Sequence, residues 1–239
     1  MTDPIPQVPP RVGWALRARR WLKPIVVPFA TLVRRRLIAR YLAHEPRPRL
    51  HVGCGPHLLA GWLNTDVAVL RFPSIIYLDA RKKLPFRDSQ LCLIFNEHFI
   101  SHLTLEEAER FLAECFRVLK PGGILRTTAP GLPFLAELAQ SGDPGCRDYV
   151  CWATERFLHV PYYSACLVVN NFFYGFGYKF IYDPPTLTWM LSRAGFSRVV
   201  SAKVGESTHP ELRGLEGHGK YIPNEFNELE TFVLEATKS

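Results

Sequence analysis

The chain has 239 residues, of which 47% are hydrophobic and 13% aromatic, so it can bury a sizeable core and is not a disordered protein. Its net charge of +7 arises in residues 1–45, which hold nine Lys or Arg against two acidic residues, while the rest of the chain is neutral. A neutral body carries no electrostatic footprint for a polynucleotide, so we predict no nucleic-acid partner. The six cysteines occur singly, without a C-x-x-C pair, which predicts reduced thiols in a cytoplasmic protein and no metal site.

Residues 1–45 form a basic, amphipathic N-terminal arm. Its longest uncharged run, 24–33, is shorter than the roughly 20 residues of a spanning helix, and no cleavage site of a signal peptide follows. Apolar residues then recur at helical spacing: Phe29, Leu32, Val33, Leu37 and Tyr41. With Arg on the other face, the arm is either a helix that contacts an anionic membrane through residues 11–42 or a helix packed on the domain. In the first case the protein is peripheral to the inner face of the membrane.

From residue 46 onward, short apolar strands alternate with helical patterns, which predicts an α/β fold with a mostly parallel sheet. We expect strands at 49–54, 62–67, 74–80, 91–97, 123–130, 197–204 and 230–237. Residues 131–182 interrupt this alternation and are dense in aromatic side chains. We expect this stretch, called the insertion below, to form a lid over the site.

Two helices carry clear boundary signals. Thr104 and Glu107 have the spacing of a capping box, and positions 105, 108, 111, 112, 115 and 119 line one apolar face. A second helix is expected to begin after Asp183, where two prolines follow, and to end at Gly195.

The first strand runs into the sequence "LHVGCGP", residues 50–56. Ligands of an open parallel sheet gather at the carboxyl ends of its strands. At those ends the sequence places Gly53, Cys54, Gly55, Asp66, Asp79, Asn96, Glu97 and His98. A glycine turn with an acid at the end of the next strand is typical of a site that holds a nucleoside through its ribose hydroxyls.

A dinucleotide site is disfavoured by two features of the same region. Its fingerprint requires a third glycine, and this chain has Leu58 there. A pyrophosphate also binds beside a helix N-terminus, whereas Asp66 follows Gly55 by eleven positions, which leaves room for about one helical turn. A nicotinamide-dependent enzyme is therefore the weaker interpretation.

The segments "LHVGCGP", "LNTDV", "LDARKKLPFRDSQLCLIFNEHFISHL", "FRVLKPGGILR" and "AGF" together resemble a class I S-adenosylmethionine-dependent methyltransferase of the "methyltransferase domain" type. The resemblance covers residues 50–130 by motif and extends to the last strand by organisation. It implies a Rossmann-like, doubly wound, mostly parallel sheet of seven strands with the last strand antiparallel. The methyltransferase domain would then span residues 46–239 and follow the helical arm.

The resemblance also implies S-adenosylmethionine as the cofactor and assigns residues to it. Gly53, Cys54 and Gly55 would pass under its methionyl and ribose part, and Asp66 would accept hydrogen bonds from the ribose hydroxyls. Asp79 and Ala80 would lie at the adenine. Asn96, Glu97 and His98 would line the floor near the methyl group.

An oxygen acceptor must lose its proton during methyl transfer, and histidine is the usual base near neutral pH. His98 and His102, which follow the fourth strand, are the expected catalytic residues, although His102 could equally cap or pack. His209 and His218 on a late loop are candidates for the acceptor side. His51, inside the first strand, is expected to be a core residue.

We therefore expect a methyltransferase that acts on a small-molecule or saccharide (glycan-type) acceptor, at oxygen. The alternative is a non-catalytic methyltransferase-like domain that its basic arm tethers to a membrane or a partner. Two departures from the family pattern support this alternative. Leu91-Cys92 stand where relatives have Phe-Asp, and the first helix is short.

Overall fold

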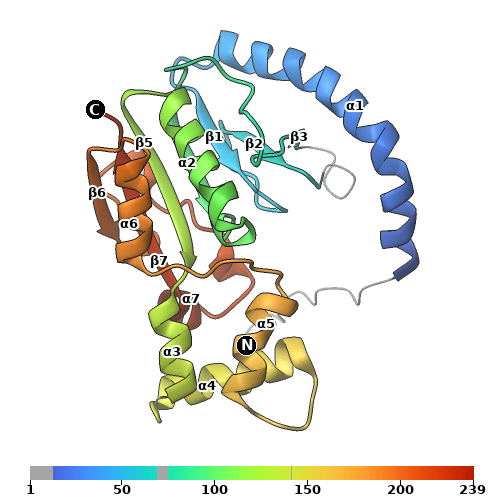
Figure 1. The fold of residues 1–239 in the computed structure, drawn as a ribbon, viewed down its shortest axis with the longest axis vertical. Helices are drawn as coiled ribbons and strands as arrows, with labels where there is room; N and C mark the ends of the chain where they lie inside the picture. Colours follow the sequence, from blue (N-terminus) through green and yellow to red (C-terminus); the bar gives the residue numbers. More distant parts are fainter. Residues whose placement is uncertain (1–12, 69–74, 141) are drawn as a thin grey trace.

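The computed structural model describes residues 13–68, 75–140 and 142–239, with the side chains of the first helix described from residue 27 onward. Residues 1–12 and the side chains of 13–26, which belong to the expected arm, therefore lie outside the described part. The core is a seven-stranded sheet with strand order β3-β2-β1-β4-β5-β7-β6 (Figure 1). The strands are β1 (Arg49–Val52), β2 (Leu63–Asp66), β3 (Ile76–Tyr77), β4 (Leu91–Glu97), β5 (Leu119–Pro130), β6 (Arg198–Ala202) and β7 (Thr231–Thr237).

The strand directions confirm the expected Rossmann-like sheet. Strands β3, β2, β1, β4 and β5 pair in parallel, whereas β7 runs antiparallel between β5 and β6. The third strand is shorter than expected, since β3 lies at the edge and pairs with β2 over two residues. Because β7 is antiparallel, its first residue, Thr231, lies beside Pro130 at the carboxyl end of β5. This end of the sheet therefore receives the start of the last strand.

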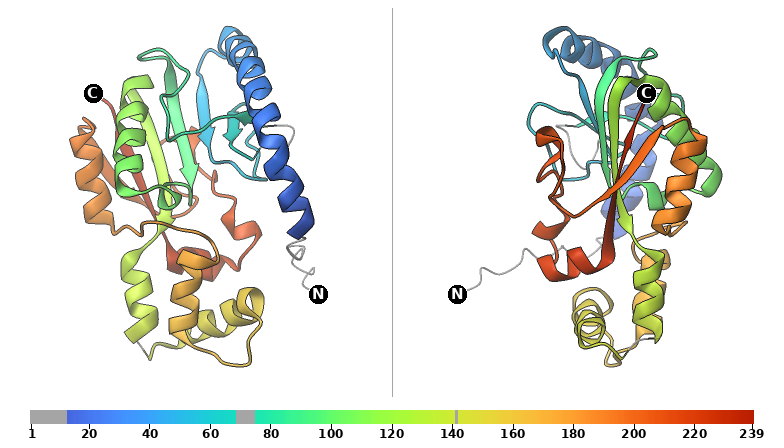
Figure 2. Two further views of the ribbon diagram at one scale, coloured as in Figure 1. Left: turned by 45° about the vertical axis from the view of Figure 1, so that its right-hand side comes forward. Right: turned by 90° about the vertical axis from the view of Figure 1, so that its left-hand side faces the viewer.

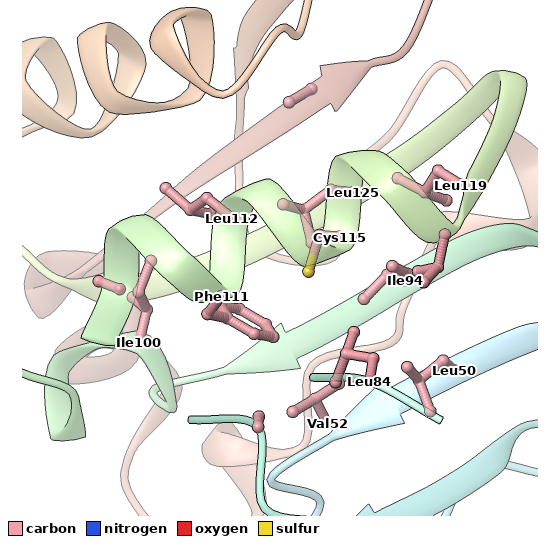
Figure 3. Close-up of a cluster of buried hydrophobic side chains, with 14 of the residues drawn as sticks. Leu50, Val52, Leu84, Ile94, Ile100, Phe111, Leu112, Cys115, Leu119 and Leu125 are labelled. Carbon is pink, nitrogen blue, oxygen red and sulfur yellow. The ribbon is translucent and has the colours of Figure 1, made fainter. Parts of the chain in front are cut away.

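One face of the sheet is covered by α2 (Leu105–Val118) and α6 (Pro184–Arg193). The capping box of Thr104 and Glu107 is present, and Asp183 caps α6 by accepting from the Thr186 N–H. Of the expected apolar face of α2, every position except Leu105 is buried against the strands (Figure 3). Leu105, the first residue of α2, is exposed, whereas Ile100 of the preceding 3-10 turn η1 (Ile100–His102) is buried in the core.

The opposite face is covered by an irregular segment, residues 203–222, called the covering segment below (Figure 2). It contains two 3-10 turns, η3 (Pro210–Leu212) and η4 (His218–Lys220), and it packs Leu212 and Leu215 against Trp62 and Phe95. Residues 56–62 form turns and not the single helical turn expected after the glycines. The covering segment occupies the face on which such a helix would lie.

The insertion folds into helices beyond the carboxyl end of the sheet (Figure 1). They are α3 (Leu132–Gln140), α4 (Pro144–Ala153), a π-helical turn η2 (Thr154–Leu158) and α5 (Ala165–Tyr174). With α7 (Asn224–Glu230) they enclose a second hydrophobic core that includes Phe134, Tyr149, Phe172, Tyr178 and Phe226. The insertion is therefore a packed helical layer in its own right.

The first helix, α1 (Gly13–His44), runs along the β3 edge of the sheet (Figure 1). It packs through Ile38 and Tyr41, and the Tyr41 hydroxyl accepts a hydrogen bond from the Arg49 N–H at 2.9 Å. Of the expected apolar stripe, Tyr41 thus packs on the domain, whereas Phe29 is 68% exposed and Leu32 is 65% exposed. Among the described residues, no helix combines the length and the apolarity needed to cross a membrane.

A buried ion cluster fixes the covering segment to the sheet. Arg126 of β5 is fully buried and donates to Glu235 of β7 at 2.5 Å and to Glu216 of the covering segment at 2.7 Å. Its guanidinium also donates to the Glu206 carbonyl at 2.9 Å and the Lys203 carbonyl at 3.3 Å. Every contact except that to Glu235 reaches the covering segment, so the Arg126 side chain ties this segment to the sheet at three points.

We expect Arg126→Met to lower the free energy of unfolding by about 3–5 kcal/mol, because the substitution leaves two carboxylates buried without their cation. Urea denaturation followed by circular dichroism measures the loss. Arg110→Met, at an exposed position of α2, is the matched control. A loss no larger than that of the control would show that the cluster does not stabilise the fold.

Candidate active site

The glycine turn lies at the carboxyl end of β1, next to the end of β2. Gly53 and Gly55 have φ angles of +66° and +51°, in the left-handed region that favours glycine. The Gly55 N–H donates to Asp66 Oδ2 at 3.0 Å, and the His57 N–H closes the turn on the Cys54 carbonyl at 2.9 Å. The structure therefore places Asp66, the acid at the end of β2, in contact with the glycine turn, as the sequence predicts.

The two glycines face different surroundings. A Cβ atom on Gly53 would lie 2.5 Å from the Phe99 ring, so only glycine leaves room for that ring. A Cβ atom on Gly55 would meet nothing within 4 Å. The open space that a nucleoside ligand needs is thus found over Gly55.

The acids at the ends of the second and third strands differ in how they are engaged. Asp66 is half-buried and accepts from two backbone N–H groups, that of Gly55 and that of Ala68 at 2.8 Å. Asp79 forms a bidentate ion pair with Arg81 at 2.8 and 2.9 Å, and this hydrogen bonding lowers the pKa of Asp79. Ala80 is buried in the main core. Asp66 is therefore the acid with more room for a ligand.

Asn96 and Glu97 end β4 on opposite faces of the sheet. Asn96 Oδ1 accepts from the Thr127 hydroxyl at 2.8 Å, while its buried Nδ2 has no partner among the described residues. Glu97 accepts from the N–H groups of Gly217 and His218 at 2.9–3.0 Å, and burial raises the pKa of Glu97. Asn96 thus offers an unused donor, whereas Glu97 anchors the covering segment.

His98 is enclosed immediately after β4. Its Nδ1 lies 3.2 Å from the Tyr178 hydroxyl and its Nε2 lies 3.0 Å from Thr231 Oγ1. Thr231 donates its own proton to Asn227 Oδ1, so it accepts from His98, and the Nε2 atom carries the hydrogen. Burial, with a smaller contribution from nearby His218, lowers the pKa of His98 well below its ordinary value. His98 is therefore a neutral ring with both nitrogens engaged.

The other candidate histidines separate into two locations. His102 and His218 line a cavity at the carboxyl end of the sheet, and burial lowers the pKa of His102. The His218 ring stacks on His98, with ring centres 4.2 Å apart. His209 instead lies near Cys92 and Lys120, at the amino ends of β4 and β5. Of the two loop candidates, the structure therefore brings His218 to the site and places His209 at the opposite end of the sheet.

The cavity has a volume of about 320 Å³ and lies between the insertion and the sheet. Its wall is mainly aromatic: Tyr149, Trp152, Phe157, Phe172, Phe176 and Tyr178. The polar lining consists of His102, Arg156, His218 and Glu230, together with the hydroxyl groups of the tyrosines. We call this space the aromatic cavity.

Glu230 is a site residue that the sequence patterns do not single out. It is 5% exposed and accepts from His218 Nε2 at 2.9 Å and from the Tyr149 hydroxyl. It directly precedes β7, and its carbonyl accepts from the Gly131 N–H at the end of β5. The expected antiparallel direction of the last strand already implies this placement, because the start of such a strand meets the carboxyl end of its neighbour.

His98, His218 and Glu230 bring three potential metal ligands within 4.8 Å of one another. An imidazole binds a metal through a lone pair in the plane of its ring, at about 2.0–2.1 Å for zinc. The two rings are stacked with only 26° between their planes, so one ion cannot lie in both planes at that distance. The arrangement fits a stacked, hydrogen-bonded pair better than a metal centre.

Part of the chain matches the profile of a known family. The profile of the family described as "Methyltransferase domain" matches residues 66–127, about a quarter of the chain. A curated protein of Haemophilus influenzae, described as an uncharacterized protein, is 44% identical over 45 residues, which are 19% of this chain and 18% of that relative.

Two solved structures are similar to the chain at 18% identity. A methyltransferase from Archaeoglobus fulgidus, described as SAM dependent, is matched over 87% of this chain and 94% of its own, with a TM-score of 0.46. A SAM-dependent methyltransferase from Thermotoga maritima is matched over 95% and 97%, with a TM-score of 0.44.

The profile match begins at Asp66 and runs through β4, α2 and most of β5, which are the elements that build the carboxyl edge of the sheet. This part of the chain is therefore similar to methyltransferase domains, and the glycine turn and the strand order are those that the resemblance implies.

The buried histidines make stability depend on pH. Burial lowers the pKa of His51 to about 4 and that of His98 well below its ordinary value, whereas an unfolded histidine titrates near 6.5. The unfolded state therefore binds more protons below about pH 6.5, and the free energy of unfolding falls as the pH decreases toward 4. The slope of the free energy of unfolding against pH approaches about 1.4 kcal/mol per pH unit for each such histidine.

We expect His51→Gln to reduce this slope, measured by urea denaturation between pH 6.5 and 4. The control His44→Gln, at an exposed histidine, should leave the slope unchanged.

Proposed function

We propose that the protein transfers a methyl group from S-adenosylmethionine to an oxygen atom of a small-molecule or glycan-type acceptor. The observation that carries this proposal is the position of the aromatic cavity. It lies at the carboxyl edge of the sheet beside the end of β4, because His218 in its wall donates its N–H to Glu97 and stacks on His98. Ligands of such a sheet bind at this edge.

The residues at this edge fit the cofactor. Gly55 lies under open space, Asp66 is half-buried, and Asn96 holds an unpaired buried donor. Asp66 and Gly55 would hold the nucleoside, while Asn96 would face the part of the cofactor nearest the methyl group. The bound cofactor supplies an electrophilic methyl carbon on a sulfonium, and the protein's part is to position the acceptor in line with it.

The two features that favour a non-catalytic domain can each be located in the structure. Cys92 lies near the start of β4, at the end of the sheet opposite the site. The short connection after the glycine turn is compensated by the covering segment, which fills the same face of the sheet. Cys92 therefore lies away from the carboxyl edge, and the covering segment supplies the cover that a longer helix would give to this face.

We expect S-adenosylmethionine and S-adenosylhomocysteine to bind, and NAD not to bind, when each is titrated calorimetrically. Asp66→Asn should weaken binding of S-adenosylhomocysteine about 10- to 100-fold, because a hydrogen bond to a charged group contributes about 1.5–3 kcal/mol. Asp148→Asn, at an exposed position of α4, is the matched control. Failure of the wild-type protein to bind either sulfur compound would reject the proposed function.

We further propose that α1 places the enzyme on an anionic membrane surface, at the cytoplasmic face. Phe29 and Leu32 point into solvent, and the nearby Arg36 and Arg40 are exposed as well. A helix face that combines apolar side chains with arginines suits the boundary between anionic headgroups and acyl chains.

The double substitution Phe29→Ser/Leu32→Ser should lower partition of the full-length protein onto phosphatidylserine-containing vesicles by at least about tenfold. Burial of one such side chain contributes about 1.5–3 kcal/mol, and two are removed. Co-sedimentation measures the bound fraction, with Leu105→Ser, at another exposed leucine, as the control. Equal partition of the double variant and the control would contradict the membrane proposal.

A further inference from the structure

The aromatic cavity contains a carboxylate–histidine pair that belongs to none of the expected catalytic residues. Glu230 is a buried carboxylate, and its Oε1 lies 2.9 Å from His218 Nε2. A carboxylate can only accept, so His218 carries its hydrogen on Nε2 and keeps a lone pair on Nδ1. The Tyr149 hydroxyl donates to the second oxygen of Glu230 and fixes its orientation.

His98 and His218 differ in what they can do. Both ring nitrogens of His98 have hydroxyl partners, and its side chain is not part of the cavity wall. His218 lines the cavity and is partly exposed, with 28% of its side chain accessible. The His218 ring is positioned by two contacts: it stacks on the ring of His98, and its Nε2 is held by Glu230.

The cavity also restricts the acceptor. A volume of about 320 Å³ is at the lower end of the range for ligand pockets, which suits a single ring with small substituents. A sugar carries hydroxyl groups on every side, and each one left unpaired in an aromatic wall is costly. Here His218 and Glu230 occur together, His102 and Arg156 are the other ionisable side chains of the wall, and aromatic rings form most of the remainder. Such a wall fits a flat, largely apolar ring with one hydroxyl group.

We propose that His218, positioned by Glu230, is the general base for methylation of a phenol-type hydroxyl group bound in the aromatic cavity. This inference rests on the proposed methyltransferase function. The acceptor oxygen forms a bond to the methyl carbon, the carbon–sulfur bond breaks, and its electron pair stays on sulfur as a thioether. The hydroxyl proton passes to His218 Nδ1, and Glu230 stabilises the resulting imidazolium. The positive charge of the sulfonium is thereby transferred to His218, and the step is balanced.

The test supplies S-adenosylmethionine with 4-methylphenol and catechol as probes and with methyl glycosides for comparison, and it detects the methylated product by mass spectrometry. We expect the phenols to be methylated at oxygen. His218→Gln should lower kcat at neutral pH by about 10²-fold or more, since a general base contributes about 10²–10⁴-fold. The variant should also lose the fall in rate that protonation of His218 causes at low pH, while it binds S-adenosylhomocysteine as the wild type does.

His209→Gln is the matched control, because His209 lies on the same covering segment at the opposite end of the sheet. Methylation of a glycoside but of neither phenol, or of none of the probes, would overturn the acceptor class. A His218→Gln variant with the wild-type rate and pH profile would overturn the role of the base. Binding of S-adenosylhomocysteine to the wild type is measured separately. Absence of that binding would reject the proposed function, whereas binding without methylation of the phenols would reject only the present inference.

Nitrogen NMR of the imidazole rings tests the tautomer of His218 without an acceptor. A hydrogen on His218 Nδ1 would contradict the proposal.

Discussion

The ion cluster around Arg126 is the interaction on which the architecture of the site depends. Arg126 and Glu235 lie directly opposite each other on β5 and β7, and Glu216 joins them from the covering segment. One cation between two carboxylates is stable away from water because backbone carbonyls fill the remaining donor positions of the guanidinium. The next residues of the segment, Gly217 and His218, are thereby brought onto Glu97 at the end of β4. The sheet interior and the cavity wall are thus joined through one stretch of chain.

This arrangement explains how the fold manages with so little chain after the glycine turn. A helix in that position would cover the second face of the sheet, and here Leu212 and Leu215 cover it from the far end of the sequence. His57 takes part as well, since its Nε2 lies 2.9 Å from the Leu215 carbonyl. The consequence for function is direct, because the chain that replaces the helix also delivers His218 to the cavity. The covering segment therefore both replaces the missing helix and carries the candidate base, His218.

Local signals predicted much of the fold, because each one depends on residues that are close in sequence. The capping box at Thr104, the proline start after Asp183 and the glycine turn at Gly53 all form as expected. The aromatic cavity could not be predicted in this way. Its wall combines α4, α5 and the covering segment, and the carboxylate of Glu230 acquires a role only when β7 is placed beside β5. The exposure of Phe29 could not be predicted from the sequence either, because helical spacing shows which residues share a face but not which face is buried.

An uncharged His98 suits the proposed methyl transfer, in which a positive charge moves from the sulfonium to His218. The donor carries a positive sulfonium, and the proposed step ends with a positive imidazolium on His218. A second positive charge on His98, whose ring centre lies 4.2 Å from that of His218, would oppose both states. Two like charges at about 4 Å repel by roughly 4 kcal/mol at an effective dielectric constant near 20. Burial under Tyr178 and Thr231 keeps His98 uncharged, so the positive charge produced at the site can be stabilised by Glu230. In the proposed step His98 is therefore a neutral support for the base, His218.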